Sequence, residues 1–477
     1  MEGVQFSDVL YHRVANRLVS LIEQGTLGPG DRLPSLRKIS ADERVSMTTS
    51  LQAYALLEMR GYVEARPQSG FYVRPHASRR IDEPGPVPSR RRAAAVDVAS
   101  GAARVLQSAQ DPRLVPLGAA CPSPALLPTR ALARLVASAG RAAIRDTNTY
   151  SFPPGRLELR REIARRSLAW GGSLGADDLL ITCGATEALS LALQATTRRG
   201  DVVAIESPAY FGTRLLLEAF GLRAVEVLTG PRDGMDVDDL AAVLGRHRVR
   251  AVIASPACQN PLGSVMPERA KRTLASLLAD HDIPLIEDDV YGEACHDGSR
   301  PAPVKARDRA GRVILCSSFS KVLAPGYRIG WIAGGRYHDD IVRLKLATTL
   351  ATPAVPQLAI AAYLRSASYE RFLRKVRAAY RDQVTRGREA VARCFPAGTR
   401  VTQPRGGFLL WVEMPPGFDG DALADAAADA GIGIAPGSLF SAHEQHRRCI
   451  RLSCGQPWTA ELDRAVETLG RLASRLR

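Results

Sequence analysis

From about Val96 onward, short apolar runs alternate with helical stretches, and this alternation limits the possible folds more than any other feature. The runs expected as strands are Leu179–Thr182, Val202–Glu206, Val252–Ser255, Pro284–Glu287 and Val313–Cys316. Between them, apolar residues at helical spacing predict helices, as at Glu187–Gln194 and Arg269–Asp280. Strands that alternate with helices form a mostly parallel sheet covered on both faces. The sequence therefore predicts an α/β domain over residues 96–477.

The last hundred residues of this domain have a different order of elements. A helical stretch comes first, and two short apolar runs follow at Gly407–Glu413 and Ile450–Ser453. We expect these elements to form a small C-terminal α/β subdomain.

Residues 1–75 are expected to form a separate domain. The evidence is a compact pattern of helix and hairpin signals over residues 5–74. Apolar residues at helical spacing run from Leu10 to Ile22, and Gly25 ends that helix. Ser35 and Ser46 are suitable N-caps for a second helix to about Asp42 and a third helix to Arg60. Two β-rich runs then flank Pro67-Gln68-Ser69-Gly70, which is typical of a hairpin. Three helices and a two-stranded wing predict a winged helix-turn-helix.

Residues 76–95 separate the two predicted domains. The segment contains Pro84, Pro86 and Pro88 and, near its end, the basic run Arg90-Arg91-Arg92. This composition predicts a flexible basic linker.

Composition narrows the possible cellular settings. No apolar run reaches the length of a membrane span, and the first ten residues lack the pattern of a signal peptide. Eight scattered cysteines form no CxxC pair, which favours reduced thiols in the cytoplasm over a disulfide or zinc framework. The net charge of +15 is typical of proteins that bind a polyanion such as DNA. Residues 1–75, however, are nearly neutral, because they hold nine basic and eight acidic side chains. Charge alone therefore does not identify a DNA-binding domain.

The stretch LPSLRKISADERVSMTTSLQAYALLEMRGYVEARPQSGFYV resembles the GntR-family winged helix along its whole length. The resemblance implies double-stranded operator DNA as partner, with Arg37 reaching a base edge or phosphate. Ser46, Thr48 and Thr49 stand at the start of the recognition helix, where hydroxyls and backbone N–H groups suit phosphate contact. Gly70 would let the wing approach the minor groove.

One position departs from the GntR pattern in a way that bears on sequence reading. Met47 stands where many members of the family carry an arginine, which could bind guanine through two hydrogen bonds. Because methionine cannot do this, sequence reading here is expected to use thymine methyl groups or DNA shape.

The second domain carries a set of short motifs whose order resembles that of fold-type I pyridoxal-phosphate enzymes, above all the aminotransferases. The motifs are Thr182-Cys183-Gly184-Ala185-Thr186, Ser207-Pro208-Ala209-Tyr210, Gln259-Asn260-Pro261, Glu287-Asp288-Asp289-Val290-Tyr291, Ser317-Ser318-Phe319-Ser320-Lys321 and Ile450-Arg451-Leu452-Ser453. The resemblance implies pyridoxal 5'-phosphate as cofactor and predicts no metal site.

The resemblance assigns the groups that hold the cofactor aldehyde and phosphate. Lys321 would form the Schiff base with the aldehyde. Ser318 and Arg328 would bind the phosphate, together with a cup of Gly184, Ala185 and Thr186 at a helix N-terminus.

The resemblance also assigns the groups around the cofactor ring. Asp288 would pair with the pyridine nitrogen and serve catalysis with Lys321, although the sequence leaves Asp289 open as the alternative. Tyr291 and Asn260 would hydrogen-bond the ring oxygen. Tyr210 would stack on the ring.

Three further residues are implied at the edge of the cofactor site. Arg451 would clamp the α-carboxylate of an amino acid, and Gly118 would lend a backbone N–H to the same ligand. Tyr150 resembles the tyrosine that reaches the phosphate bound by a partner subunit, in a head-to-tail homodimer.

A GntR-like winged helix followed by an aminotransferase-like domain resembles the MocR/GabR regulators, here most like their YdcR-like branch. This implies a transcription regulator that senses an amino acid, an amine or the cofactor itself through a cofactor aldimine. A working aminotransferase of the 2-aminoadipate or kynurenine type, with an inert winged helix, is the alternative. A third possibility is a repressor that keeps the cofactor only for structure.

Overall fold

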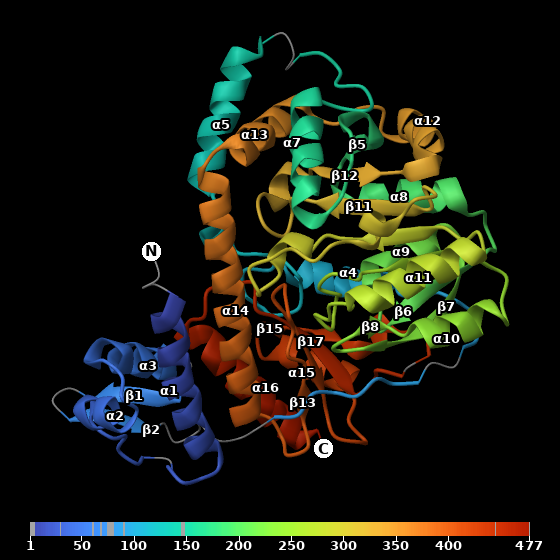
Figure 1. Cartoon of the computed structure of the whole chain (residues 1–477). Coiled ribbons are helices and arrows are strands. Elements are labelled where there is room, and N and C mark those ends of the chain that lie inside the picture. The colour runs from blue at the N-terminus through green and yellow to red at the C-terminus, as the bar shows by residue number, and fades with distance from the viewer. Residues whose placement is uncertain are drawn as a thin grey trace. The chain divides into compact units, whose positions relative to one another are not determined.

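The computed structural model describes residues 5–28, 30–59, 62–66, 69–73, 81–88, 91–144, 148–443 and 445–476. Its contacts divide the chain into two compact units, residues 1–81 and residues 82–477 (Figure 1). We call the first unit the head and the second the effector unit.

The head has the predicted winged helix-turn-helix fold. Its elements are α1 (Gln5–Glu23), α2 (Leu36–Asp42), α3 (Met47–Met59), β1 (Val63–Arg66) and β2 (Gly70–Val73). Ser35 caps α2 by accepting a hydrogen bond from the backbone N–H of Lys38, as its position predicted. The wing is an antiparallel hairpin in which Val63 pairs with Val73. The expected helix end at Arg60-Gly61, part of the hairpin turn at Pro67-Gln68, and Arg74 lie outside the described residues.

The head has its own hydrophobic core. Val14 and Leu18 of α1 pack against Leu57 of α3, and all three side chains are almost completely buried. The hydroxyl of Tyr54 donates to the carbonyl of Pro34 over 2.7 Å, which ties α3 to the segment before α2. The packing of α2 and α3 is therefore set by the head alone.

A large sheet organises the effector unit. Its strands follow the order β3-β7-β6-β9-β10-β11-β12-β5, with β8 paired to β7. Strands β7, β6, β9, β10 and β11 are parallel, whereas β12 is antiparallel to both of its neighbours. Their bounds are β3 (Ala94–Ala95), β5 (Leu179–Thr182), β6 (Val202–Ser207), β7 (Arg223–Gly230), β8 (Gly234–Met235), β9 (Val249–Ala254), β10 (Leu285–Asp288), β11 (Val313–Ser318) and β12 (Gly330–Ala333).

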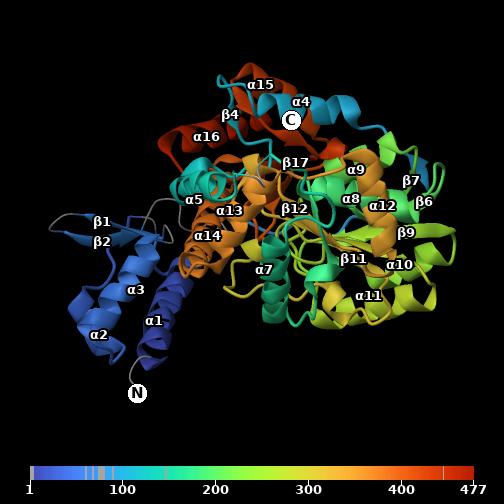
Figure 2. The same cartoon turned by 90° about the horizontal axis from the view of Figure 1, so that it is seen from above.

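Helices cover both faces of this sheet, as predicted (Figure 2). Successive side chains of a strand point to opposite faces. In β10, Ile286 belongs to the core beneath α8, whereas Leu285 belongs to the core beneath α10 and α11. The helices of this part are α4 (Ala99–Ser108), α5 (Thr129–Ala142), α7 (Leu157–Ser167), α8 (Gly184–Thr196), α9 (Phe211–Ala219), α10 (Val237–Leu244), α11 (Glu268–Asp280), α12 (His338–Thr348) and α13 (Ala354–Arg365).

The predicted small C-terminal subdomain is present. The long helix α14 (Ser368–Cys394) leads into a four-stranded sheet of order β13-β14-β17-β16. The remaining bounds are β4 (Val115–Pro116), β13 (Arg400–Val401), β14 (Leu409–Glu413), β15 (Ile432–Gly433), β16 (Ala435–Pro436), β17 (Cys449–Ser453), α15 (Gly420–Asp429) and α16 (Ala460–Arg475). Because β4 pairs with β15, the segment after α4 is joined to this subdomain.

The described part of the predicted flexible linker, from residue 82 onward, is instead bound to the effector unit. The carbonyl of Asp82 accepts from the backbone N–H of Val401 over 2.9 Å, and the carbonyl of Pro88 accepts from Gln445 over 2.9 Å. Residues 94–95 form β3 at the edge of the large sheet. The expectation of a flexible segment over residues 76–95 is therefore wrong for these residues, because partners distant in sequence satisfy their backbone groups.

Across the described residues, we find no helix that is both long and apolar enough to cross a membrane.

Candidate functional site

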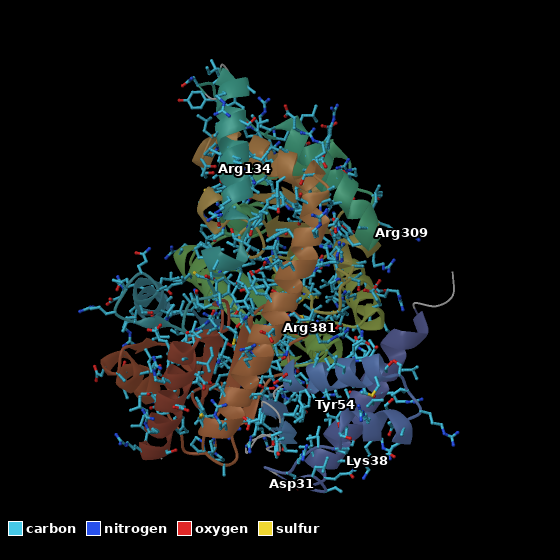
Figure 3. The ribbon with its side chains drawn as sticks, turned by 90° about the vertical axis from the view of Figure 1, so that its left-hand side faces the viewer. Asp31, Lys38, Tyr54, Arg134, Arg309 and Arg381 are labelled. Atoms are coloured by element: carbon cyan, nitrogen blue, oxygen red, sulfur yellow. The ribbon has the colours of Figure 1, made fainter. Side chains whose placement is uncertain are left out.

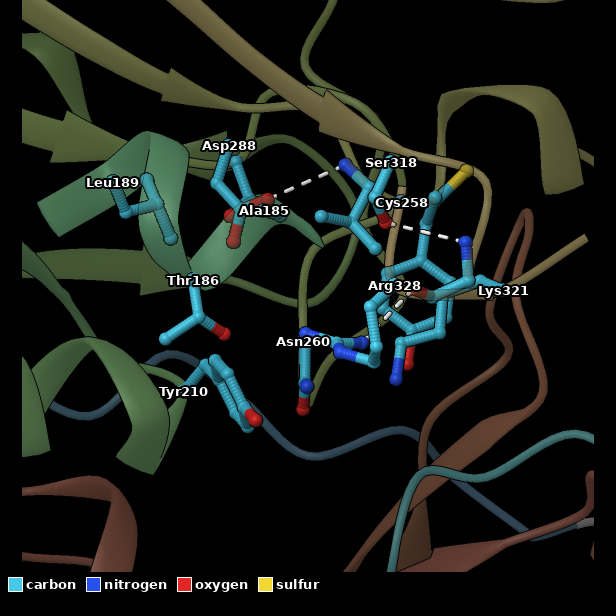
Figure 4. A pocket seen from close by; sticks show the side chains of 14 residues that line it. Ala185, Thr186, Leu189, Tyr210, Cys258, Asn260, Asp288, Ser318, Lys321 and Arg328 are labelled. Atoms are coloured by element: carbon cyan, nitrogen blue, oxygen red, sulfur yellow. Dashed lines mark hydrogen bonds between the residues drawn. The ribbon is translucent and has the colours of Figure 1, made fainter. Parts of the chain in front are cut away.

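One cavity of the effector unit gathers most of the side chains predicted to hold a cofactor (Figure 4). Its volume of about 160 Å³ is roughly ten times the space that one water molecule needs. It is lined by Ala185, Thr186, Leu189, Tyr210, Ser255, Cys258, Asn260, Asp288, Val290, Tyr291, Ser318, Ser320, Lys321 and Arg328. Of the predicted cofactor residues, Gly184 lies directly beside this lining and Tyr150 does not belong to it.

The start of α8 forms one wall of the cavity. Gly184 has a φ of +75°, and a Cβ added there would meet Nη2 of Arg328 at 2.4 Å. Only glycine therefore fits both the left-handed backbone and the close approach of the guanidinium group. Ala185 and Thr186 follow in the first helical turn, whose N–H groups have no partners within a helix. This end of α8 can bind an anion.

The loop after β11 brings a second set of groups to the same wall. The hydroxyl of Ser318 accepts from the backbone N–H of Ser320 over 3.3 Å, and the Ser320 hydroxyl accepts from Arg328 over 3.4 Å (Figure 4). Arg328 itself has a φ of +53°, which is uncommon for a residue with a side chain. Two hydroxyls, a guanidinium group and a helix N-terminus thus converge on one corner of the cavity.

Lys321 extends from this loop, and its ammonium group donates to the carbonyl of Ala120 over 2.7 Å. Burial lowers the pKa of Lys321 to about 8, against the opposing effect of negative groups such as Asp288. An amine with this pKa is partly neutral near physiological pH. Lys321 can therefore act as a nucleophile toward a carbonyl carbon.

The structure places the two neighbouring aspartates in different environments. Asp288 shares the α8 side of the sheet with Ile286 and lines the cavity, where burial raises its pKa to about 6. Asp289 forms a buried ion pair with Arg300 and does not belong to the cavity wall. The cavity thus receives the carboxylate of Asp288, the first of the two alternatives.

Aromatic side chains line the cavity near Asp288. The Tyr291 ring packs edge-on against Phe408, and its buried hydroxyl has no hydrogen-bond partner among the described residues. Lys321 Nζ lies 5.7 Å from the centre of that ring. Tyr210, at the start of α9, also lines the cavity. The Tyr291 hydroxyl is thus available to a ligand.

Arg451, on β17 of the small subdomain, is completely buried behind this cavity. Its Nη1 donates to the side-chain oxygen of Asn260 over 3.1 Å, and its Nη2 donates to the carbonyl of Gly118 over 2.5 Å. The rings of Phe211 and Phe440 lie 5.3 and 5.0 Å from the guanidinium carbon. Its Nε has no partner among the described residues. Gly118 thus makes its contact through its carbonyl oxygen, whereas the sequence predicted a role for its N–H.

Tyr150 is the predicted cofactor residue that the chain does not bring to the cavity. Its side chain is 70% exposed, and its ring stacks on Phe152 at 5.3 Å. Its predicted contact with a partner subunit stays a prediction.

The sequence reasoning missed several cavity residues. Ser255 follows β9 and Val290 follows β10, at the edge of the sheet where the parallel strands end. Ligands of open α/β sheets bind at the carboxyl ends of strands, and this rule could have identified both residues. Ser320 stands inside the motif Ser317-Ser318-Phe319-Ser320-Lys321, two of whose other members received roles, whereas Cys258 and Leu189 carry no comparable signal in the sequence.

The predicted DNA-binding residues divide into exposed and buried ones. Arg37, Ser46 and Thr48 are exposed, and Gly70 begins β2 of the wing with a φ of +109°. Ser46 caps α3 by accepting from the Thr49 backbone N–H over 3.0 Å. The Thr49 side chain is only 6% exposed, and its hydroxyl lies 2.8 Å from that of Ser46. The structure therefore does not bring Thr49 to the surface with the others.

Comparisons with known proteins agree with this division of the chain. Residues 10–73 match the family of bacterial regulatory proteins of the gntR type, and residues 124–469 match aminotransferase class I and II. The HTH-type transcriptional regulator YdcR of Escherichia coli is 40% identical over 97% of this chain and 98% of its own length. A second regulator of that bacterium, YjiR, is 36% identical over 96% of this chain and 98% of its own length.

A solved structure matches the effector unit. It is LysN, an α-aminoadipate aminotransferase of Thermus thermophilus complexed with N-(5'-phosphopyridoxyl)-L-leucine. The two chains are 28% identical with a TM-score of 0.73, and the match covers 79% of this chain and 97% of LysN.

The chain belongs to the MocR-type regulators, in which a GntR winged helix precedes a fold-type I aminotransferase-like domain. It is a DNA-binding transcription regulator whose effector unit binds pyridoxal 5'-phosphate.

The described residues fit this cofactor. The corner formed by the α8 start and Arg328 suits a phosphate, and the cradle at Gly184 leaves no room for a Cβ. The Tyr291 hydroxyl without a partner suits a ring substituent. Bound pyridoxal 5'-phosphate supplies an aldehyde that captures amines and a ring that accepts electrons.

Proposed function

We propose that the effector unit senses an amino acid or a related amine at its cofactor site and thereby changes the affinity of the head for a double-stranded operator. The observation that carries this proposal is the position of Arg451. Its guanidinium group is fully buried, and its Nε has no partner among the described residues. The group donates a hydrogen bond to Asn260, a wall residue of the cavity that also contains Lys321. An arginine in such a place suits a carboxylate ligand.

The cavity residues have separate parts in this proposal. Lys321 holds the cofactor and yields its place to the amine of the effector. Asp288 keeps the ring nitrogen protonated, and Tyr291 and Asn260 hold the ring oxygen. Gly184, Ala185, Thr186, Ser318 and Arg328 bind the phosphate, and Tyr210 stacks on the ring.

The segment of residues 82–95 is the proposed transmitter, because its described residues, 82–88 and 91–95, are bound to both parts of the effector unit. Asp82 and Pro88 accept hydrogen bonds from Val401 and Gln445 in the C-terminal part. Arg91 forms an ion pair with Asp239 beside the large sheet. Since Arg451 belongs to the small subdomain, a shift of that subdomain on effector binding would pull on this segment. A ligand acts only through differential affinity for the two arrangements.

The proposed assembly is a head-to-tail homodimer. Tyr150 and Phe152 stack on each other with 70% and 53% of their surfaces exposed, and Ile144 is 66% exposed nearby in sequence. Large apolar side chains exposed in one region of the chain are typical of protein interfaces. In the dimer, Tyr150 would reach the phosphate in the partner's site. The Tyr150→Phe variant should then bind the cofactor more weakly, whereas an unchanged affinity would contradict the contact.

A slow transamination activity is the second candidate, because Lys321 and Asp288 both line the cavity and burial lowers the pKa of the Lys321 amine to about 8. Two measurements on the same protein separate the candidates. The first is operator affinity with and without each amino acid, expected to differ by roughly 5–150-fold for the effector. The second is release of a 2-oxo acid after addition of an acceptor. Rapid multiple turnover without any change of operator affinity would overturn the sensing proposal.

A further inference from the structure

Over its first nine residues, Met47–Ala55, α3 exposes no charged side chain. The exposed residues of this stretch are Met47, Thr48, Leu51, Gln52 and Ala55, all on one side of the helix. On the opposite side, Ala53, Tyr54 and Leu57 are buried in the head. The two sides are set by helical periodicity. The N-terminal part of α3 therefore presents an uncharged, partly apolar surface, and the partly exposed Glu58, which accepts from the Ala65 backbone N–H, lies beyond it.

Two large apolar side chains dominate this surface. Met47 is 46% exposed and Leu51 is 52% exposed, one helical turn apart. Among the described residues of the head, no other large hydrophobic side chain is exposed. A single exposed leucine needs no explanation. Here, however, the exposed pair lies on the helix that a winged helix-turn-helix inserts into DNA.

Exposed basic side chains are found on the neighbouring elements of the head rather than on this face of α3. Arg37 and Lys38 on α2 and Arg44 before α3 are exposed, and Lys38 and the buried Tyr54 can be located in Figure 3. In a DNA duplex, phosphates likewise border a groove whose floor is made of base edges. The charge pattern thus complements the major groove, with cations for the backbone and an uncharged helix face for the bases.

Base edges in the major groove offer one apolar group, the C5-methyl of thymine. Met47 and Leu51 have no group that donates a hydrogen bond to guanine. We propose that this face reads thymine methyl groups through Met47 and Leu51, and that the operator half-sites contain thymine at the contacted positions. Gln52 adjoins Leu51 and can pair with the adenine opposite such a thymine. The inference rests on the proposed operator binding and specifies what the head reads.

The test removes the methyl groups alone. A duplex is first recovered from a random-sequence pool with the full-length protein, and each of its thymines is then replaced by deoxyuridine. Deoxyuridine keeps the base pairing but lacks the C5-methyl. We expect roughly fourfold weaker binding for each contacted methyl that is lost. The salt dependence should not change, because the phosphate contacts remain.

Two variants and a control sharpen the result. Met47→Ala with Leu51→Ala should bind the thymine and deoxyuridine duplexes equally. Met47→Arg should shift the selected base toward guanine. The control is Leu168→Ala, which truncates a leucine of the effector unit that is 68% exposed. This variant should still bind the thymine duplex more tightly than the deoxyuridine duplex. Thermal unfolding of each variant checks that the head stays folded.

The possible failures are distinguishable. Equal affinity of the unaltered protein for the two duplexes would overturn the methyl-reading inference while operator binding stands. Failure to enrich any duplex from the pool would overturn operator binding itself. The Lys38→Ala variant should bind the thymine duplex and the deoxyuridine duplex more weakly by the same factor. This result would support the assignment of Lys38 to phosphate contact and of α3 to base contact.

Discussion

The guanidinium group of Arg451 donates a hydrogen bond to the side-chain oxygen of Asn260 over 3.1 Å. The bond joins β17 of the small subdomain to a wall residue of the cofactor cavity. Both residues come from motifs that the sequence places almost two hundred positions apart. Any movement of Arg451 toward a ligand therefore changes the hydrogen bonding of Asn260.

The Arg451→Ala variant should lose its response to amino acids and keep its cofactor. The substitution leaves the buried oxygens of Asn260 and Gly118 without their donor, so the free energy of unfolding should fall by about 1–3 kcal/mol. The measurement is the absorbance of the bound cofactor during titration with an amino acid. The matching amine, which lacks the α-carboxylate, is the control and should act on both proteins alike. A full response of the variant to the amino acid would contradict the role of Arg451.

Capture of the cofactor by the cofactor-free protein should depend on pH through Lys321. Because burial lowers the pKa of this amine to about 8, the neutral form gains as pH rises. The rate of capture should therefore rise with pH and be half-maximal near pH 8. After borohydride reduction, peptide mapping should find the cofactor on Lys321.

The Lys321→Ala variant should bind the cofactor without a reducible bond. The Lys375→Ala variant removes an exposed lysine of α14 and should behave like the unaltered protein. A reduced adduct on Lys305 or Lys345 would contradict the assignment of Lys321.

Asp288 and Asp289 should differ sharply when each is changed to asparagine. Asp288→Asn should alter the absorbance of the bound cofactor, because an amide cannot stabilise a protonated ring nitrogen. Asp289→Asn should leave the spectrum nearly unchanged. It should instead lower the free energy of unfolding by about 3 kcal/mol, since it breaks a buried ion pair with Arg300. The reverse pattern would exchange the two assignments.

The Gly184→Ala variant should weaken cofactor binding. At this position the backbone has a positive φ, and a Cβ would meet Arg328 at 2.4 Å, so the phosphate corner must shift. A loss of about 1–3 kcal/mol is expected for such a strained residue. The measurement is cofactor release on dilution. Gly140→Ala in α5, where a Cβ meets nothing within 4 Å, is the matched control and should bind the cofactor normally.

The sequence alone predicted the elements and motifs that depend on neighbouring residues. The N-cap Ser35 predicted α2 with an end near Asp42, and the apolar run Leu179–Thr182 predicted a strand at its observed bounds. The winged helix, the α/β sheet, the small subdomain and the binding of pyridoxal 5'-phosphate are confirmed. These features are readable because hydrophobic periodicity, caps and turn residues act over a few positions.

Only the tertiary structure decided which groups meet through space. It placed Asp288 in the cavity and Asp289 against Arg300, because successive side chains leave a strand on opposite faces. It also buried Thr49, which its position had predicted to contact phosphate, and bound the described residues of 82–95 to the effector unit, where composition had predicted flexibility. Exposure and hydrogen bonding depend on partners distant in the chain, such as Val401 for Asp82, and no local pattern encodes them.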